Sequence, residues 1–300
     1  MSDLDLPSGL TSRPLVMSDA RAVYEVMAAQ EQQDIGEVAI EEADIVGDWQ
    51  RPSYDVSAGT LGVFDGETLV AYVELSGMDR GDAAVHPDYR GRGIGTALAG
   101  WMQARGRAVG STVVGMPVAQ GSDGDRLLEQ LGYRVRWESW ELVLPEGASV
   151  PHRDLPDGYT LREATPEDYE ACWTVLEDAF LEWSVRDREP FADFLARTTE
   201  RPDFAPWHLR LVTDPDGAVA GVTYVRLFET QGYVDRIATR RDQRGRGIAQ
   251  AMLVDAFAAA RDHGATSSTL NTDSRTGALG LYEKVGMSVF RTWVNRGKDL

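Results

Sequence analysis

The chain is poor in cysteine and histidine. Its 300 residues include one cysteine, Cys172, and four histidines that are scattered without the spacing of metal ligands. A single thiol cannot form an internal disulfide, and we expect no metal site. Cys172 recurs with apolar residues at helical spacing, so we interpret it as a buried core residue and not as a nucleophile.

Long apolar runs are also absent. No apolar run reaches about 18 residues, the length from which a membrane-spanning helix is inferred. The first residues, MSDLDLPSGL, are acidic and lack the apolar core of a signal peptide. The sequence therefore predicts a cytoplasmic protein without a membrane partner.

Basic residues are in the minority, with 30 Lys and Arg against 48 Asp and Glu, and the formal net charge is −18. This balance opposes nucleic-acid binding, because proteins that bind nucleic acid present a basic face to the phosphates. The negative charge either keeps the surface soluble or attracts a cationic substrate.

Glycine and arginine are concentrated in one turn, RGRGIA, which follows a short apolar run and opens a helix. Gly247 and Ala249 lack the side chains that would keep a ligand away from the first turn of this helix. The free N–H groups and the positive end of the helix dipole favour a phosphate there, and Arg244 and Arg246 add positive charge. The turn predicts an anion site, although a plain strand-to-helix connection has the same pattern.

The turn occurs twice. In the first half the chain reads YRGRGIG, and Arg90 and Arg244 are 154 residues apart (244 − 90). The same offset carries LLEQLGY at Leu127 onto LYEKVGM at Leu281. The chain is therefore a tandem repeat of one domain. We predict domains at 1–145 and 157–300, with a linker at 146–156, because the stretch around the linker holds three prolines and no apolar periodicity.

Strands alternate with helices in each half, which predicts an α/β fold. Each copy is expected to open with a short strand and a helix and to continue through an irregular helical segment, near 40–49 and 190–198. A hairpin with an Asp-Gly turn or a related turn follows, and then the strand that leads into the glycine turn.

The glycine turn and the later LYEKVGM segment together resemble two motifs of the GNAT superfamily of N-acetyltransferases. These are the Arg/Gln-x-x-Gly-x-Gly/Ala pyrophosphate loop and a helix with a tyrosine shortly before Gly-Met. The resemblance covers residues 9–293 and implies two GNAT folds in tandem, each a mixed, splayed β-sheet flanked by helices. It also implies that acetyl-CoA is the acyl-donor substrate and that the acceptor is a small-molecule amine.

The resemblance implies that both copies hold acetyl-CoA. In the second copy the implied contacts are Ile237, Ala238, Thr239, Arg244, Gly245, Arg246, Gly247, Ile248, Ala249, Asn271 and Ser274. In the first copy they are Val85, Arg90, Gly91, Arg92, Gly93, Ile94 and Gly95. At Ser274 the sequence departs from several relatives, which have asparagine at this position.

Tyr282 matches the family tyrosine that commonly protonates the departing thiolate, although a tyrosine packed under the sheet would show the same local pattern. The first copy has Leu128 at this place, which has no proton to give, so its domain is expected to be inactive or regulatory. The resemblance indicates Asp235 as the general base; Glu229 and an ordered water are alternatives.

The sequence thus predicts an acetyl-CoA-dependent N-acetyltransferase that acetylates a primary amine, with its active site in the C-terminal domain. The alternative is a non-catalytic acetyl-CoA-binding sensor or regulatory module. The acidic segment at 178–187, with Asp178 and Glu182, is expected to favour the approach of a cationic amine. The sequence does not indicate which amine is the acceptor, or the oligomeric state.

Overall fold

A computed structural model describes residues 4–145 and 147–300. The strands are β1 (Leu10–Arg13), β2 (Thr60–Asp65), β3 (Thr68–Leu75), β4 (Gly81–Val85), β5 (Val113–Ala119), β6 (Arg134–Leu144), β7 (Thr160–Glu163), β8 (Leu209–Thr213), β9 (Val219–Phe228), β10 (Gln231–Thr239), β11 (Ser267–Asp273) and β12 (Ser288–Asp299). The α-helices are α1 (Ala20–Ile35), α2 (Glu42–Trp49), α3 (Val56–Gly59), α4 (Ile94–Val109), α5 (Asp123–Gln130), α6 (Tyr169–Phe180), α7 (Phe191–Arg197), α8 (Ile248–Asp262) and α9 (Leu279–Lys284). Short 3-10 helices lie at Met17–Asp19, Pro87–Tyr89, Pro166–Asp168, Pro206–His208 and Arg241–Gln243.

The chain divides into two compact units whose ranges differ from the predicted domains. The first unit is Met1–Glu138 with Thr292–Leu300, and the second is Ser139–Arg291. In the first unit, β12 pairs antiparallel with β5, and in the second unit the last part of β6 pairs antiparallel with β11. Each copy's final strand therefore completes the sheet of the other copy. The repeat offset cannot reveal this exchange, because periodicity does not specify which neighbour a strand pairs with.

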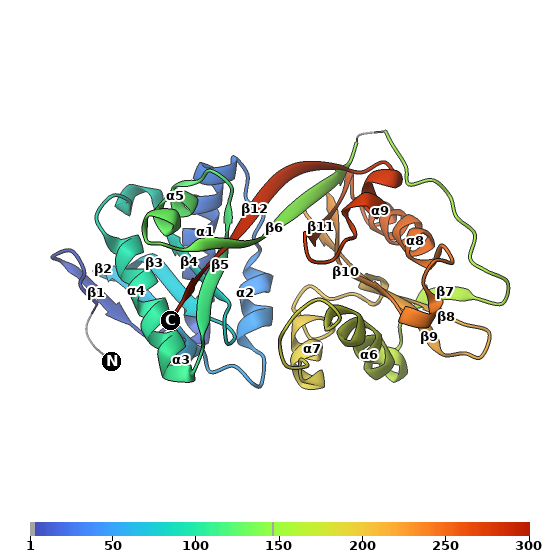
Figure 1. The fold of residues 1–300 in the computed structure, drawn as a ribbon, viewed down its shortest axis with the longest axis horizontal. Coiled ribbons are helices and arrows are strands. Elements are labelled where there is room, and N and C mark those ends of the chain that lie inside the picture. Colours follow the sequence, from blue (N-terminus) through green and yellow to red (C-terminus); the bar gives the residue numbers. More distant parts are fainter. Residues whose placement is uncertain (1–3, 146) are drawn as a thin grey trace. The chain divides into compact units, whose positions relative to one another are not determined.

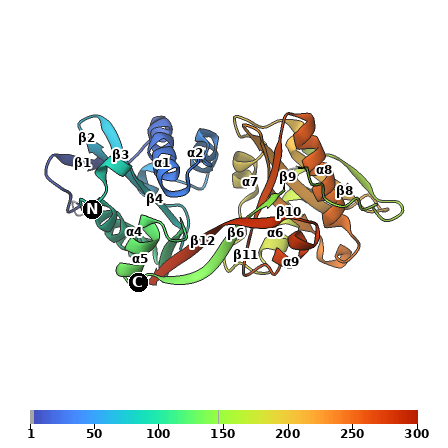
Figure 2. The same ribbon diagram turned by 90° about the horizontal axis from the view of Figure 1, so that it is seen from above.

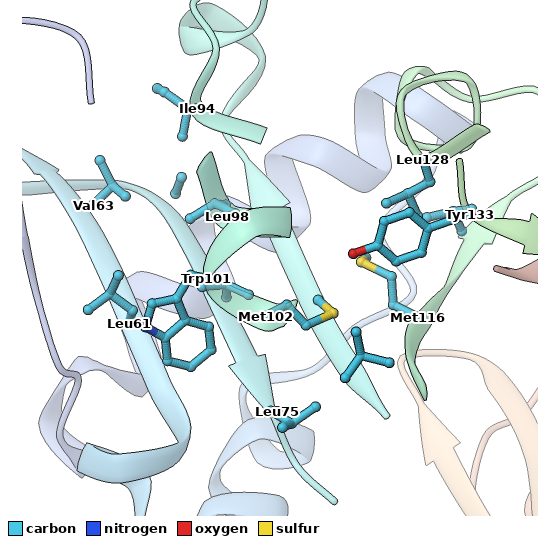
Figure 3. Packing of buried hydrophobic residues seen from close by; sticks show 14 of the residues in the cluster. Leu61, Val63, Leu75, Ile94, Leu98, Trp101, Met102, Met116, Leu128 and Tyr133 are labelled. Carbon is cyan, nitrogen blue, oxygen red and sulfur yellow. The ribbon is translucent and has the colours of Figure 1, made fainter. Parts of the chain in front are cut away.

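In the first unit, β1, β2, β3 and β4 form an antiparallel sheet in that order. Helix α4 packs Leu98, Trp101 and Met102 against one face, as Figure 3 shows. Helices α1 and α2 pack on the other face, in a separate apolar cluster (Figure 2). The alternation of side chains along β2 and β3 supplies both cores, because successive residues point to opposite faces.

In the second unit, the strand order is β6, β11, β10, β9, β8 and β7. Helix α8 lies on one side of these strands, and α6 and α7 lie on the other (Figure 1). Cys172 is fully buried in the cluster beneath α6, and burial raises the pKa of its thiol to about 12. The interpretation of Cys172 as a core residue is confirmed.

The strand before each glycine turn separates from its neighbour. In the second unit, β10 pairs in parallel with β11 only from Gln231 to Val234. A register shift follows at Asp235, after which β10 stays paired with β9 and β11 stays paired with β6. In the first unit, an isolated bridge between Arg80 and Gly115 is the corresponding contact of β4 with β5. Both sheets are mixed or splayed at this point, as the sequence predicts.

Two kinds of feature are missing from the described residues. Across 4–145 and 147–300, no helix is long and apolar enough to cross a membrane. In the same residues, no three His, Cys, Asp or Glu side chains are grouped so that they could hold a metal ion.

Candidate functional site

The glycine turn of the second unit has the backbone of an anion cradle. Gly245 and Gly247 have φ angles of 76° and 84°, a left-handed region that favours glycine. Gly247 is the N-cap of the 15-residue helix α8 and provides no side-chain hydrogen bond to its first N–H groups. These N–H groups are therefore available to an anion, which the helix dipole would also attract.

The two arginines of this turn differ in their partners. Arg244 donates from both terminal nitrogens to the carboxylate of Glu182, at 2.8 and 2.7 Å, and from Nε to the carbonyl of Thr239 at 3.2 Å. Arg246 donates to the hydroxyl of Tyr159 at 3.3 Å. The Arg244 guanidinium also lowers the pKa of the Glu182 carboxyl.

Three acidic residues at the end of α6 and just after it are paired with arginines. Glu182 is held by Arg244, Asp178 is paired with Arg188, and the buried Glu177 is paired with Arg186 at 2.7 Å. The structure therefore corrects the expectation that Asp178 and Glu182 present free negative charge to a cationic amine. The cause is the arginine content of neighbouring loops, which one-dimensional charge counting does not place in space.

The end of β10 directs two N–H groups away from β9. The N–H of Arg240 donates to the carbonyl of Ala220 at 2.8 Å. In an antiparallel pair the direction alternates, so the N–H groups of Thr239 and Ile237 face the edge that β11 has left. The N–H of Ala238 is directed into the sheet instead. The hydroxyl of Thr239 is buried and has no hydrogen-bond partner among the described residues.

Tyr282 lies on α9, with 7% of its surface exposed, in the apolar cluster that includes Phe257 of α8. Burial raises the pKa of its phenol to about 12, so the group is protonated at neutral pH. Within the described residues its hydroxyl has no hydrogen-bond partner. The ring therefore packs in the core, and the buried phenol keeps its proton at neutral pH.

The two candidate bases, Asp235 and Glu229, lie at different places along the chain. Asp235 sits at the register shift, with 29% of its side chain exposed and an oxygen 3.9 Å from Nε of Arg236. Glu229 lies in the turn between β9 and β10, with a φ of 49°. This turn is at the opposite end of β10 from the glycine turn. The geometry therefore favours Asp235 over Glu229.

Asn271 and Ser274 flank the same separation of strands. Asn271 directly follows Leu270, the last β11 residue paired with β10, and its side chain is exposed. Ser274 is exposed in the turn after β11. Both residues lie on the β11 side of the separated strands.

In the first unit, the corresponding turn has the same backbone. Gly91 and Gly93 have φ angles of 73° and 88°, and Gly93 begins α4 without a side-chain cap. Leu128 takes the place of Tyr282, because the N–H of Tyr133 donates to its carbonyl at 2.9 Å. The N–H of Met287 makes the same contact with Tyr282, at 3.1 Å. Figure 3 shows Leu128 in the apolar cluster with Tyr133.

In the first unit, the N–H of Val85 and the guanidinium of Arg90 are bound by side chains of the same unit. The N–H of Val85 donates to the side-chain oxygen of Gln30 at 3.0 Å. Arg90 donates to both oxygens of Asp34, at 2.6 and 3.0 Å, and to Asp123 at 3.2 Å. Sequence reasoning missed Gln30 and Asp34. They lie on α1, far from the motif in the chain, and they carry no local signature.

These features define the class. The chain belongs to the acetyltransferase (GNAT) family, whose model matches residues 22–133 and 161–287. It is thus a tandem GNAT acetyltransferase with one family fold in each half, and the predicted family, fold class and type of enzyme are confirmed.

Two named relatives show which acetyltransferases this chain is similar to. The chain is 33% identical over 247 residues to the mycothiol acetyltransferase of Salinispora arenicola, covering 76% of this chain and 77% of the relative. It is 31% identical over 267 residues to that of Salinispora tropica, covering 83% and 82%. The layout of two GNAT copies in tandem is also similar to that of mycothiol synthase.

Solved structures agree on the fold. A GCN5-related N-acetyltransferase from Sphaerobacter thermophilus aligns with a TM-score of 0.73 and 27% identity, covering 98% of this chain and 96% of that one. A tandem GNAT protein from the clavulanic acid biosynthesis pathway aligns with the same TM-score and 17% identity, covering 97% and 98%. At this identity the second match supports the fold alone.

Proposed function

We propose that the protein is an acetyl-CoA-dependent N-acetyltransferase whose working site is in the second unit and whose acceptor is a primary amine. The observation that carries the proposal is the pairing of Tyr282 with an uncapped glycine turn in one unit. In the other unit, a leucine takes the place of Tyr282, and the side chain of Gln30 accepts the N–H of Val85.

The second unit fits the acyl donor in two respects. The α8 N-terminus offers N–H groups and left-handed glycines to a pyrophosphate. The Thr239 hydroxyl is buried and unpartnered, and the N–H groups of Thr239 and Ile237 face the same edge of β10. Such donors can bind the carbonyl oxygen of a thioester and stabilise the negative charge that develops on it.

In the proposed reaction, Asp235 and Tyr282 each take part in one proton transfer. The acceptor nitrogen forms a bond to the acetyl carbon, and the carbon–sulfur bond breaks. Asp235, directly or through a water, accepts the proton that the amine loses, and Tyr282 donates a proton to the departing thiolate. The phenol can serve as the acid because burial keeps it protonated.

The names of the relatives suggest the first acceptor to test. Two chains at 33% and 31% identity are called mycothiol acetyltransferases. The amine of the unacetylated mycothiol precursor is therefore the acceptor that we place first. The arginine-neutralised segment after α6 gives no separate reason to prefer a polycation.

The decisive experiment incubates the purified protein with acetyl-CoA and a panel of amines and measures free thiol release. The panel contains the mycothiol precursor, an aminoglycoside, a polyamine and a peptide, with an amine-free control for thioester hydrolysis. We expect acceptor-dependent thiol release that Asp235→Asn lowers. If acetyl-CoA binds and no amine is consumed, the protein is a sensor and not an enzyme.

A further inference from the structure

The segment at 151–159 wraps around the N-terminus of α8, although the sequence assigns most of it to a linker. Gln250 of α8 donates to the carbonyl of Pro151 at 2.7 Å. The hydroxyl of Tyr159 donates to the side chain of Gln243 at 2.5 Å. Leu155 and Tyr159 also pack in an apolar cluster with Ile248. The segment is therefore part of the second unit and is fixed beside the glycine turn.

This arrangement places Arg153 on the turn itself. A Cβ atom added to Gly247 would lie 2.5 Å from Nε of Arg153 and 2.9 Å from its Cγ. The Arg153 side chain thus lies directly against the N-cap of α8. It is exposed, and no carboxylate of the described residues is paired with it. The same is true of Arg246, whereas Arg244 is paired with Glu182.

Without a bound anion, the positions of Arg153 and Arg246 are electrostatically unfavourable. Arg153 and Arg246 bring positive charge to the positive end of the α8 dipole, where an anion is the stabilising group. Carboxylates are abundant, with 48 acidic against 30 basic residues, yet among the described residues no carboxylate is paired with Arg153 or Arg246. An anionic ligand would satisfy both guanidinium groups and the free N–H groups of α8 together.

We infer that Arg153 is a further ligand for a phosphate of coenzyme A, either the pyrophosphate or the adenosine 3′-phosphate. This inference rests on the proposed function and adds a contact from outside the glycine motif. The segment before β7 thereby adds a guanidinium beside the first N–H groups of α8.

The first unit has no arginine at the position that corresponds to Arg153. An offset of 149 residues carries Gly9 onto Gly158 (158 − 9) and Leu4 onto Arg153. Leu4 packs against the apolar core of the first unit, and a Cβ added to Gly93 would meet nothing within 4 Å. The cationic contact is therefore specific to the second copy.

The test is calorimetric binding of coenzyme A to the full chain with Arg153→Gln, with Arg153→Lys as the conservative variant. Loss of one charged hydrogen bond is expected to weaken binding about tenfold, and lysine should restore part of it. Arg261→Gln, at the opposite end of α8, removes the same charge and is expected to change affinity less than about twofold. Thermal unfolding without ligand checks that each variant is folded.

The same titrations with 3′-dephospho-coenzyme A identify the phosphate. A penalty for Arg153→Gln that disappears with this ligand assigns the 3′-phosphate, and one that persists assigns the pyrophosphate. An affinity of folded Arg153→Gln equal to that of the unsubstituted protein, or an equal loss in Arg261→Gln, overturns the inference. Failure of the unsubstituted protein to bind coenzyme A would instead reject the proposed function.

Discussion

The two units share a fold and a glycine turn but differ in the groups around that turn. The second unit has Tyr282 where the first has Leu128, and it has Arg153 where the first has Leu4. In the first unit, Gln30 occupies the N–H of Val85. The comparison teaches that the same glycine turn can be surrounded by different side chains, so the backbone of the turn does not by itself determine which groups a ligand can reach. Side chains from other elements decide whether the binding groups are available.

The largest expected effect comes from blocking the turn. Gly247→Glu places a carboxylate and a Cβ at a left-handed position that already touches Arg153. Loss of two or more charged hydrogen bonds, at roughly 2 kcal/mol each, should lower turnover about a thousandfold. The matched variant Gly93→Glu should leave turnover unchanged. Thiol release with both variants measures this, and loss of activity only in Gly93→Glu would move the working site to the first unit.

Tyr282→Phe tests the second difference. Removing the proton donor should lower kcat about a hundredfold and leave the Kd for acetyl-CoA nearly unchanged. Tyr133→Phe changes a similarly buried tyrosine of the first unit and is the control. Because the Tyr282 pKa is about 12, kcat should show no loss of this acid below about pH 10. An unchanged kcat in a chemistry-limited assay would leave Tyr282 as a packing residue.

The first unit contains a pair of acidic residues, Glu74 and Asp82, that affects its stability. Glu74 lies opposite Asp82 on neighbouring strands and accepts a hydrogen bond from Trp49 at 2.9 Å. Burial raises the pKa of Glu74 to about 8 and that of Asp82 to about 6. In the second unit the equivalent strands pair Tyr224 with Arg236 instead, so no such carboxyl pair is formed there.

The raised pKa of Glu74 makes stability depend on pH. Between about 4.5, the ordinary value, and about 8, the folded state retains a proton that the unfolded state has lost. Stability therefore falls as the pH rises through this window. Each unit of pKa shift corresponds to about 1.4 kcal/mol, so Glu74→Gln should raise the free energy of unfolding by several kcal/mol at pH 8.5 and change it little at pH 4.5. Denaturant titrations at both pH values measure it, and equal effects at the two would contradict the assignment.

The smallest expected effect concerns the filled site of the first unit. Gln30→Ala frees the N–H of Val85, and acetyl-CoA should then bind the first unit about tenfold more tightly, in line with one recovered hydrogen bond. Calorimetry of a Gly247→Glu background isolates this site from the second. Gln32→Ala, on the same helix, is the control. If the first unit binds acetyl-CoA equally well before and after the change, Gln30 does not obstruct it.

Much of the fold was accessible from the sequence because its signals are local. Gly245 and Gly247 adopt the left-handed backbone that the turn requires, and the pattern around Tyr282 produces the short helix α9 that ends before Gly286. The irregular segments at 40–49 and 190–198 became α2 and α7. Turn chemistry and helical periodicity depend on neighbouring residues, so they can be read from one sequence.

The sequence by itself determined the tandem repeat, the two glycine turns and the tyrosine at the position where the first copy has Leu128, and its resemblance to the GNAT family implied the splayed sheets. Tertiary structure decided which strands complete each sheet, because β6 and β12 find partners in the other copy's unit. It also placed Gln30, Asp34 and Arg153 at the two turns. These contacts join residues far apart in the chain, and their energies depend on distance and burial, which neither periodicity nor composition encodes.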